Sequence, residues 1–348
     1  MTGEGLALDV RAYAPKIEMR IAVRRSMVVE FSLSNVSVNA SMTVTPAVSV
    51  DSNSRTGLTR STRLRLLPGR HRIEFQVPFD DQFRFGFIGD SGGGSELAWC
   101  LTRAAALGAD FVLHAGDFYY SDQDFATLSA VLEDSPLPVY ASIGNHDFHR
   151  DGRYIHRDFT REVGPRNAYF QLGETLFVNF DTAASTWPVG SGERAELFER
   201  LRSYRQNFDQ VVLMTHRPLH DPRFQSGSDE AHALSEREKH WVVDELLRLT
   251  PEPVLLAGHI HISAEHVEDG IKTYVSGEGL GSRNLVSGRA IARILVGEKR
   301  PGRAVTYRWE PLDMPVAAYC HEKNRETLHL MDKPAPPGSF GSRCVNYQ

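Results

Sequence analysis

Polar side chains that can bind metal ions follow five short apolar runs of the sequence. Each run has the length and composition of a buried β-strand. Because the carboxyl ends of strands in an α/β sheet converge on one crevice, we expect these side chains to lie together. One such residue alone is often a helix cap or a core histidine, but the whole set indicates a site. Its members are Asp90 after "FRFGFIG", Asp117 after "FVLHAG", Asn145 and His146 after "PVYASIG", His216 after "QVVLMT", and His259 and His261 after "PVLLAG".

The residue types indicate the chemistry. Oxygen and nitrogen donors suit iron, zinc or manganese better than soft metals. Two such ions about 3.5–4 Å apart hold both the attacking and the leaving oxygen of a displacement at phosphorus, and they need a shared carboxylate. Asp117 has the central position for that bridge. Glycine precedes Asp90, Asp117, Asn145 and His259, which leaves room for a metal pair.

From about residue 82 the chain alternates short apolar runs with helical stretches, a pattern typical of a layered α/β domain. Further strands are expected at 176–180, 272–277, 290–296 and 304–311. Helices are expected at 95–108, 124–134, 193–206 and 236–250. The segment 332–348 is rich in Pro and Gly and is expected to be a surface loop.

The preceding part of the chain has a different pattern. Residues 17–80 are rich in β-branched, Ser and Thr residues in alternation, which is typical of strands. Pro68-Gly69 lies between two alternating runs and predicts a hairpin turn. We therefore expect a small β-sandwich-like domain at 1–80, followed by a catalytic domain at 81–348.

The ordered motifs "GDSGG", "GDFYY", "GNHD", "MTHRP" and "GHIH" resemble the calcineurin-like metallophosphoesterase superfamily over about residues 82–300. Most members carry D-x-H in the first motif, whereas this chain has "DSG" at 90–92. Tyr120, three residues after Asp117, resembles the arrangement of the purple acid phosphatases, as does "VSGEGLG" at 275–281. The resemblance implies an α/β fold, a four-layer α/β/β/α sandwich. Larger purple acid phosphatases also have an N-terminal β-sandwich.

The resemblance also implies the roles of the metal ligands. Asp117 would bridge two metal ions. An Fe3+ ion would be held by Asp90, Tyr120 and His261, since a trivalent ion prefers hard anionic oxygens. A second ion, Fe2+, Zn2+ or Mn2+, would be held by Asn145, His216 and His259.

The remaining candidates surround these ligands. We expect His146 to donate a proton to the leaving group or to hold a phosphoryl oxygen, with Asp147 orienting its imidazole. His149, Arg150 and His220 are candidate substrate contacts. For Tyr119 we expect a packing role, and for His114 a place in the core. His240 is expected to be structural, and His232 to lie on a surface loop without a chemical role.

Composition restricts the function. The formal net charge of the 348-residue chain is −5, which disfavours nucleic-acid polymers as partners. No segment is apolar enough for a signal peptide or a membrane span, so we expect a cytoplasmic protein. Cys100, Cys320 and Cys344 favour reduced thiols over a disulfide framework, although Cys320 and Cys344 could pair.

The expected function is hydrolysis of a small phosphate monoester by metal-bound hydroxide. Phosphodiesterase activity at the same site, on cyclic nucleotides or phospholipid headgroups, is an alternative. A binding or scaffold protein that has lost the chemistry is another, which the full set of competent donors disfavours.

Overall fold

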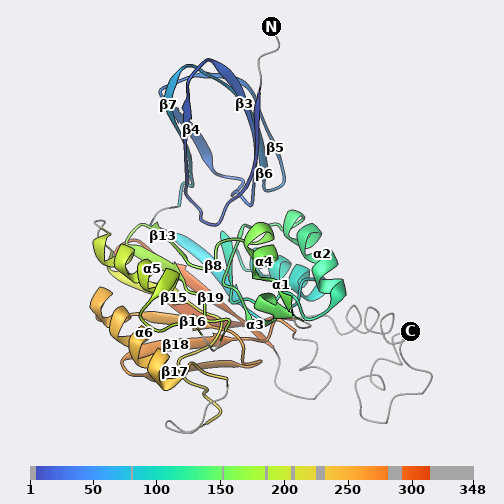
Figure 1. Ribbon diagram of the computed structural model, residues 1–348. Coiled ribbons are helices and arrows are strands. Elements are labelled where there is room, and N and C mark those ends of the chain that lie inside the picture. The colour runs from blue at the N-terminus through green and yellow to red at the C-terminus, as the bar shows by residue number, and fades with distance from the viewer. Residues whose placement is uncertain are drawn as a thin grey trace, which may run out of the picture.

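The computed structural model describes residues 5–79, 81–150, 153–184, 187–204, 208–224, 232–280 and 292–313 (Figure 1). Cys320, Cys344, the 332–348 segment and the side chain of Arg150 lie outside the described part. No helix of the described part is both long enough and apolar enough to cross a membrane.

The N-terminal part is all-β, as expected. Two sheets face each other and enclose alternating apolar side chains. One sheet has the order β1 (Leu6–Arg11), β3 (Met27–Ser34), β6 (Thr59–Leu66) and β5 (Ser49–Thr56). The other has the order β2 (Ile17–Val23), β7 (Gly69–Gln76) and β4 (Ser41–Thr45).

The hairpin expected at Pro68-Gly69 is wrong. These residues connect β6 to β7, but β6 pairs with β3 and β5, whereas β7 pairs with β2 and β4. The chain passes from one sheet to the other, so that Leu64 of β6 and Ile73 of β7 are buried in one core between the sheets. Alternation gives the inward face of each strand but not its pairing partner.

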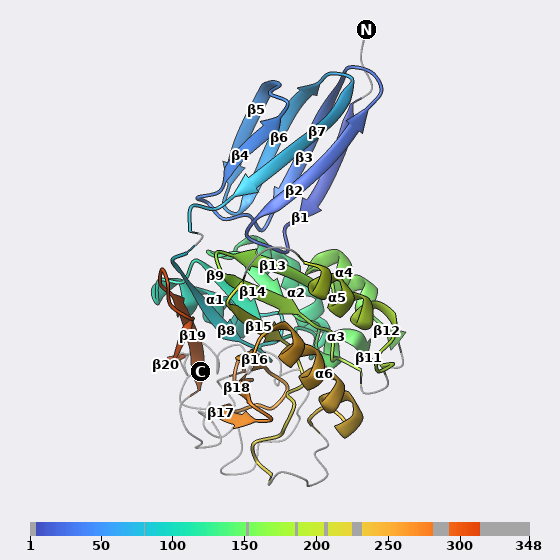
Figure 2. The same cartoon turned by 90° about the vertical axis from the view of Figure 1, so that its left-hand side faces the viewer.

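The second part contains two further sheets (Figure 2). The first has the order β10 (Val139–Ala141), β9 (Phe111–His114), β8 (Phe83–Ile88), β19 (Arg293–Lys299) and β20 (Thr306–Pro311). The second has the order β13 (Ala168–Leu172), β14 (Thr175–Asn179), β15 (Gln210–Met214), β16 (Val254–Ala257), β18 (Ile271–Ser276) and β17 (Ser263–Glu268). The strands that precede the candidate ligands are parallel to one another within each sheet, while β8 is antiparallel to its other neighbour, β19.

The four long helices lie where the sequence predicts them: α1 (Ser95–Ala106), α2 (Asp122–Glu133), α5 (Gly192–Ser203) and α6 (Glu236–Leu249). Several short elements were not expected: α3 (Asn145–Phe148), β11 (His149–Arg150), β12 (Arg153–Tyr154), α4 (His156–Glu162), β13 and β17. The first four of these lie within 145–162 and begin inside the "GNHD" motif.

Strand alternation explains the layers. On β15, Val212 packs into the core between the two sheets, and Val211 packs against α5 and α6. On β9, Phe111 likewise faces the other sheet, and Val112 packs against α1 and α2. The four-layer α/β/β/α arrangement is therefore confirmed, and the parallel strand ends open onto one edge.

Asn35 joins the N-terminal sandwich to the second part. Its side-chain amide donates to the carbonyls of Ala12 at 2.7 Å and Val139 at 2.8 Å, and its Oδ1 accepts the N–H of Val139 at 2.8 Å. Val139 belongs to β10, the edge strand of its sheet, so the amide pairs with that edge as a neighbouring strand residue would.

Candidate metal centre

The seven predicted ligands follow the carboxyl ends of strands in the two sheets, six of them on loops and Asn145 at the start of α3. Asp90, Asp117 and His216 are fully buried, while the other four are partly exposed. Asp117 lies between two groups of these side chains. Its Oδ2 is 3.1 Å from the hydroxyl of Tyr120, and its Oδ1 is 3.4 Å from Nε2 of His216. Two oxygens directed to different groups fit a bridging carboxylate.

The first group converges on Tyr120. Its hydroxyl is 3.1 Å from Oδ1 of Asp90 and 3.1 Å from Nε2 of His261. Burial, together with the charges of Asp90 and Asp117, raises the pKa of this phenol well above its ordinary value. The phenol therefore keeps its proton unless a strong Lewis acid displaces it.

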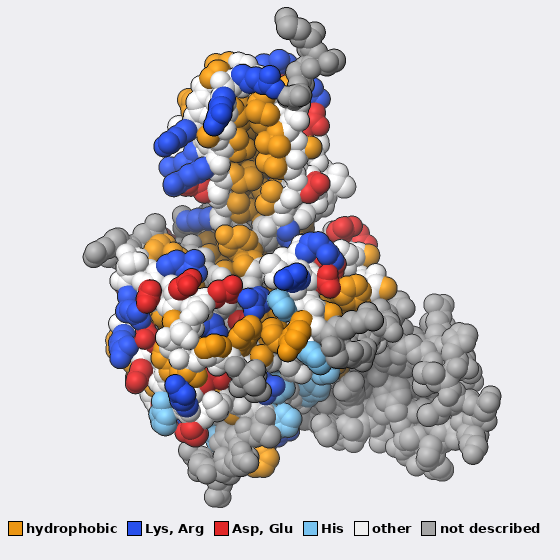
Figure 3. Space-filling model, in the orientation of Figure 1, with side chains coloured by type: hydrophobic (Ala, Val, Ile, Leu, Met, Phe, Trp, Pro, Cys, Tyr) orange, Lys and Arg blue, Asp and Glu red, His pale blue; other side chains and the backbone are white. Residues whose placement is uncertain are grey.

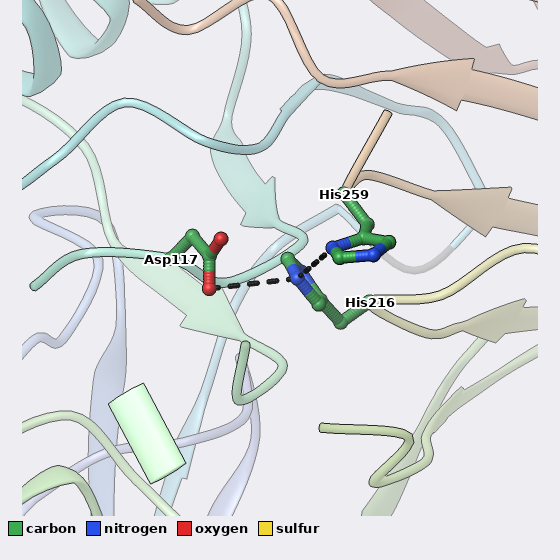
Figure 4. Close-up of side chains that lie close together, drawn as sticks. All are labelled: Asp117, His216 and His259. Atoms are coloured by element: carbon green, nitrogen blue, oxygen red, sulfur yellow. Dashed lines mark hydrogen bonds and ion pairs between the residues drawn. The ribbon is translucent and has the colours of Figure 1, made fainter. Parts of the chain in front are cut away.

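The second group contains Asp117, His216 and His259, whose donor atoms all lie within 4.8 Å of one another (Figure 4). His216 Nδ1 lies 2.7 Å from the carbonyl of Ala115, which fixes the proton there and directs the Nε2 lone pair into the group. That Nε2 is 2.9 Å from Oδ1 of Asn145 and 3.1 Å from Nδ1 of His259.

The histidines of this group are suited to metal binding, because only a neutral imidazole has a lone pair to offer. Burial lowers the pKa of His259, and the neighbouring His216 and Arg217 lower it further. This environment favours the neutral, ligating form of His259.

Backbone strain accompanies the site. Asp90, Asp117 and His259 have φ values of 61°, 64° and 65°, in the left-handed region that costs a non-glycine residue about 1–3 kcal/mol. Two glycines permit the loops to approach one another closely. A Cβ on Gly144, which precedes Asn145, would lie 2.1 Å from Oδ1 of Asp117, and one on Gly258, which precedes His259, would lie 2.6 Å from Oδ2 of Asp90.

Asp147 differs from expectation. Its Oδ2 accepts the backbone N–H groups of Asp117 at 2.8 Å and Gly144 at 2.9 Å, and its Oδ1 accepts those of Phe118 at 2.7 Å and Tyr119 at 3.2 Å. Four donors use the four lone pairs of the carboxylate. Asp147 therefore holds the loop of Asp117 rather than the imidazole of His146.

His146 is exposed at the rim of the first group. Its ring centroid lies 4.6 Å from that of Tyr120, and its backbone N–H donates to Oδ1 of Asp117 at 2.9 Å. The backbone thus helps to orient the central carboxylate, while the imidazole stays accessible to a bound ester.

Two of the candidate substrate contacts lie in different surroundings. His149 is exposed, with its ring 5.3 Å from that of Tyr154. His220 is buried, and its Nδ1 lies 3.4 Å from Oε2 of Glu268 on β17. Its ring contacts that of His266 at 5.5 Å.

The expected core positions of Tyr119 and His114 agree with the structure. Tyr119 is buried and donates to Glu162 at 3.2 Å. His114 is buried, accepts the N–H of Gly116 at Nδ1 and contacts Ser91 Oγ at 2.9 Å through Nε2. His240 is exposed on α6.

Sequence reasoning missed two residues beside His259. Nη1 of Arg217 lies 3.2 Å and Nδ1 of His232 lies 3.4 Å from Nε2 of His259. Arg217 directly follows a predicted ligand, which is a signal that could have found it. His232 had no such signal, because it is distant from His259 in the sequence and lies beside it only in the folded structure.

These donors fit a pair of metal ions. Two groups of oxygen and nitrogen donors share one carboxylate, and at least one imidazole has its lone pair directed inward. The first group has the carboxylate and phenolic oxygens with one imidazole, that of His261, and the second has two imidazoles and the amide oxygen.

Comparisons with known proteins show the family and similar folds. The family description "Metallophos: Calcineurin-like phosphoesterase" matches residues 83–263. The structure of the purple acid phosphatase PPD1 from yellow lupin (Lupinus luteus) is similar in fold, with a TM-score of 0.53 and 12% identity over 86% of this chain and 70% of that chain. GAP50, the anchor in the inner membrane complex of Plasmodium, matches with a TM-score of 0.48 and 12% identity over 67% of this chain and 85% of that chain. No curated protein matches the chain.

Proposed function

Because the chain belongs to the calcineurin-like phosphoesterase family, we propose that it hydrolyses a small phosphate monoester at a centre of two metal ions. The observation that carries this proposal is the position of Asp117 between two groups of donors. A carboxylate so placed suits a pair of ions that acts on one phosphoryl group.

The first ion would be held by Asp90, Tyr120 and His261 together with one oxygen of Asp117. The oxygen donors of Asp90, Asp117 and Tyr120 support a trivalent ion there, since such an ion prefers hard anionic oxygens. The second ion, Fe2+, Zn2+ or Mn2+, would be held by Asn145, His216 and His259 with the other oxygen of Asp117.

When bound, the two ions supply an acidified water and polarise the phosphoryl oxygens. The protein supplies the remaining chemistry. His146 stands exposed beside the first group, where its imidazole can donate a proton to the oxygen of the departing alcohol. Asp147 and the His146 amide hold Asp117 in one orientation, so the bridge needs little rearrangement.

The experiment that tests this proposal combines metal analysis with kinetics on phenyl phosphate and the diester bis(phenyl) phosphate. We expect close to two metal ions per chain and a higher kcat/KM for the monoester. In Asp117→Ala we expect loss of metal and of both activities, because the shared ligand is gone. A preference for the diester would replace the monoester assignment. Full metal content without turnover of either ester would point to a binding protein.

A further inference from the structure

Phe148 links the candidate metal centre to a group of aromatic side chains. It lies on α3 with Asn145, three residues away, and residues at this spacing share one face of a helix with Cβ atoms roughly 5–6 Å apart. Phe148 is therefore on the same helical turn as a predicted ligand of the second ion, with its half-buried ring packed against the edge of the core. His146, the proposed proton donor, lies on the same turn.

Three rings surround Phe148. Its ring stacks on that of His156, with centroids 5.2 Å apart and planes 21° apart. It meets the rings of Tyr154 and Trp187 edge to face, at 5.6 Å and 5.2 Å. We call Phe148, Tyr154, His156 and Trp187 the aromatic surface. Figure 3 shows hydrophobic and histidine side chains together on the face where α3 and α4 lie in Figure 1.

Trp187 has a fixed orientation in this surface. Its Nε1 donates to Oδ1 of the buried Asp181 at 3.2 Å, and the guanidinium of Arg166 lies 5.2 Å from its ring centroid. Arg166 in turn pairs with Asp181 and Glu193. The indole is therefore held by a polar network, which limits the entropy that it loses on binding a ligand.

Tyr154 is the most exposed member. It is 70% exposed although it belongs to an aromatic group, and its ring also meets that of His149 at 5.3 Å. A large exposed aromatic side chain offers a face on which a second planar ring can stack.

We propose that the aromatic surface binds a planar aromatic group in the alcohol part of the phosphate ester. This inference rests on the proposed phosphoesterase function and extends it to a substrate class. With the phosphoryl group at Asp117 and the departing oxygen near His146, the alcohol part extends along α3 to Phe148 and the rings around it. Both a simple aryl-methyl ester and a nucleotide contain such a ring.

Two pairs of substrates separate the effect of an aromatic ring on kcat/KM from the effect of leaving-group reactivity. Benzyl phosphate and cyclohexylmethyl phosphate both release a primary alcohol of similar size, but only the first has an aromatic ring. Adenosine 5′-monophosphate and ribose 5-phosphate both release a 5′-hydroxyl, but only the first has a base. In at least one pair we expect the aromatic member to have a kcat/KM about 5- to 100-fold higher, the range that stacking on an aromatic side chain gives.

Two variants and a control connect this preference to the surface. Tyr154→Ala and Trp187→Leu should raise KM for the aromatic esters and bring each pair close to parity, with kcat nearly unchanged, since stacking acts on ground state and transition state alike. Tyr13→Ala removes a tyrosine that is 52% exposed in the N-terminal part and should leave the preference unchanged. Preference in the first pair identifies simple aromatic esters, and preference in the second pair alone identifies nucleotides.

Binding measured without turnover separates this inference from the proposed function. Adenosine and benzyl alcohol should quench the tryptophan fluorescence of the metal-loaded protein, and Trp187→Leu should abolish the quenching. Quenching without hydrolysis of any ester would support the aromatic surface and contradict the proposed function. Equal kcat/KM within both substrate pairs, or a higher kcat/KM for the aromatic esters that survives in both variants, would overturn the inference. If no ester is hydrolysed, the absence of quenching would overturn it.

Discussion

Both carboxylate oxygens of Asp147 accept backbone N–H groups from the loop that carries Asp117. Thirty residues separate the two aspartates, yet the buried carboxylate fixes the left-handed backbone of the predicted bridging ligand. A residue next to the proposed proton donor therefore acts on the metal ligands through the backbone.

We predict that Asp147→Asn lowers both metal content and stability. The amide cannot accept all four N–H groups, and its own N–H2 faces some of them, so the free energy of unfolding should fall by about 2–4 kcal/mol. Urea unfolding and metal analysis measure the two effects. Asp134→Asn, at an exposed helix end, is the matched control. A loss of turnover at unchanged stability and metal content would restore the role expected from the sequence, that of orienting His146.

For His146→Ala we predict the opposite pattern. Turnover should fall by about 10²–10⁴-fold, the usual contribution of a general acid, while metal content stays close to that of the wild type. An ester with a good leaving group should recover part of the rate, because its oxygen departs without a proton. His240→Ala, which removes an exposed histidine on α6, should change neither quantity. If His146→Ala loses one metal ion per chain, the residue is a ligand.

The shared position of the strand-end donors could be predicted from the sequence because they come just after buried apolar runs, and a glycine directly precedes Asp90, Asp117, Asn145 and His259. Gly144 and Gly258 are required where their loops approach Asp117 and Asp90. The role of Asp147 could not be predicted, because its hydrogen bonds join segments about 30 residues apart. The position of His232 likewise depends on the return of a loop to His259. Local patterns identify elements and their faces, whereas such contacts depend on the assembled fold.

We propose that the chain divides into two domains near residue 80, and that Asn35 holds them together. Asn35 is buried with φ 61°, and it makes three hydrogen bonds at 2.7–2.8 Å, two of them to Val139 of the second part. Removal of its side chain leaves the backbone groups of Val139 without these partners, so Asn35→Ala should lower the free energy of unfolding by about 2–4 kcal/mol.

Asn35→Gly separates the two possible causes. Glycine tolerates the left-handed backbone but has no amide, so it should destabilise the protein nearly as much as alanine if the hydrogen bonds matter. Urea unfolding of both variants, with metal content as a second readout, tests this. Stability close to wild type in Asn35→Gly would mean that backbone strain, and not the contact with β10, causes the effect in Asn35→Ala.

The last prediction concerns Tyr120, because it separates a purple acid phosphatase-like centre from another pair of metal ions. A phenolate bound to Fe3+ absorbs visible light through charge transfer from ligand to metal, so iron-loaded protein should be pink to violet. Tyr120→Phe removes the hydroxyl that lies 3.1 Å from each of Asp90, Asp117 and His261, and the band should disappear. The three remaining ligands should still hold the ion, so some activity should survive.

Tyr119→Phe is the matched control for this experiment. Its hydroxyl donates to Glu162 instead, so the variant should keep the colour. Colour that persists in Tyr120→Phe and disappears in Tyr119→Phe would show that Tyr119, and not Tyr120, binds the metal. A colourless wild-type protein with a full complement of ferric iron would contradict the phenolate ligand.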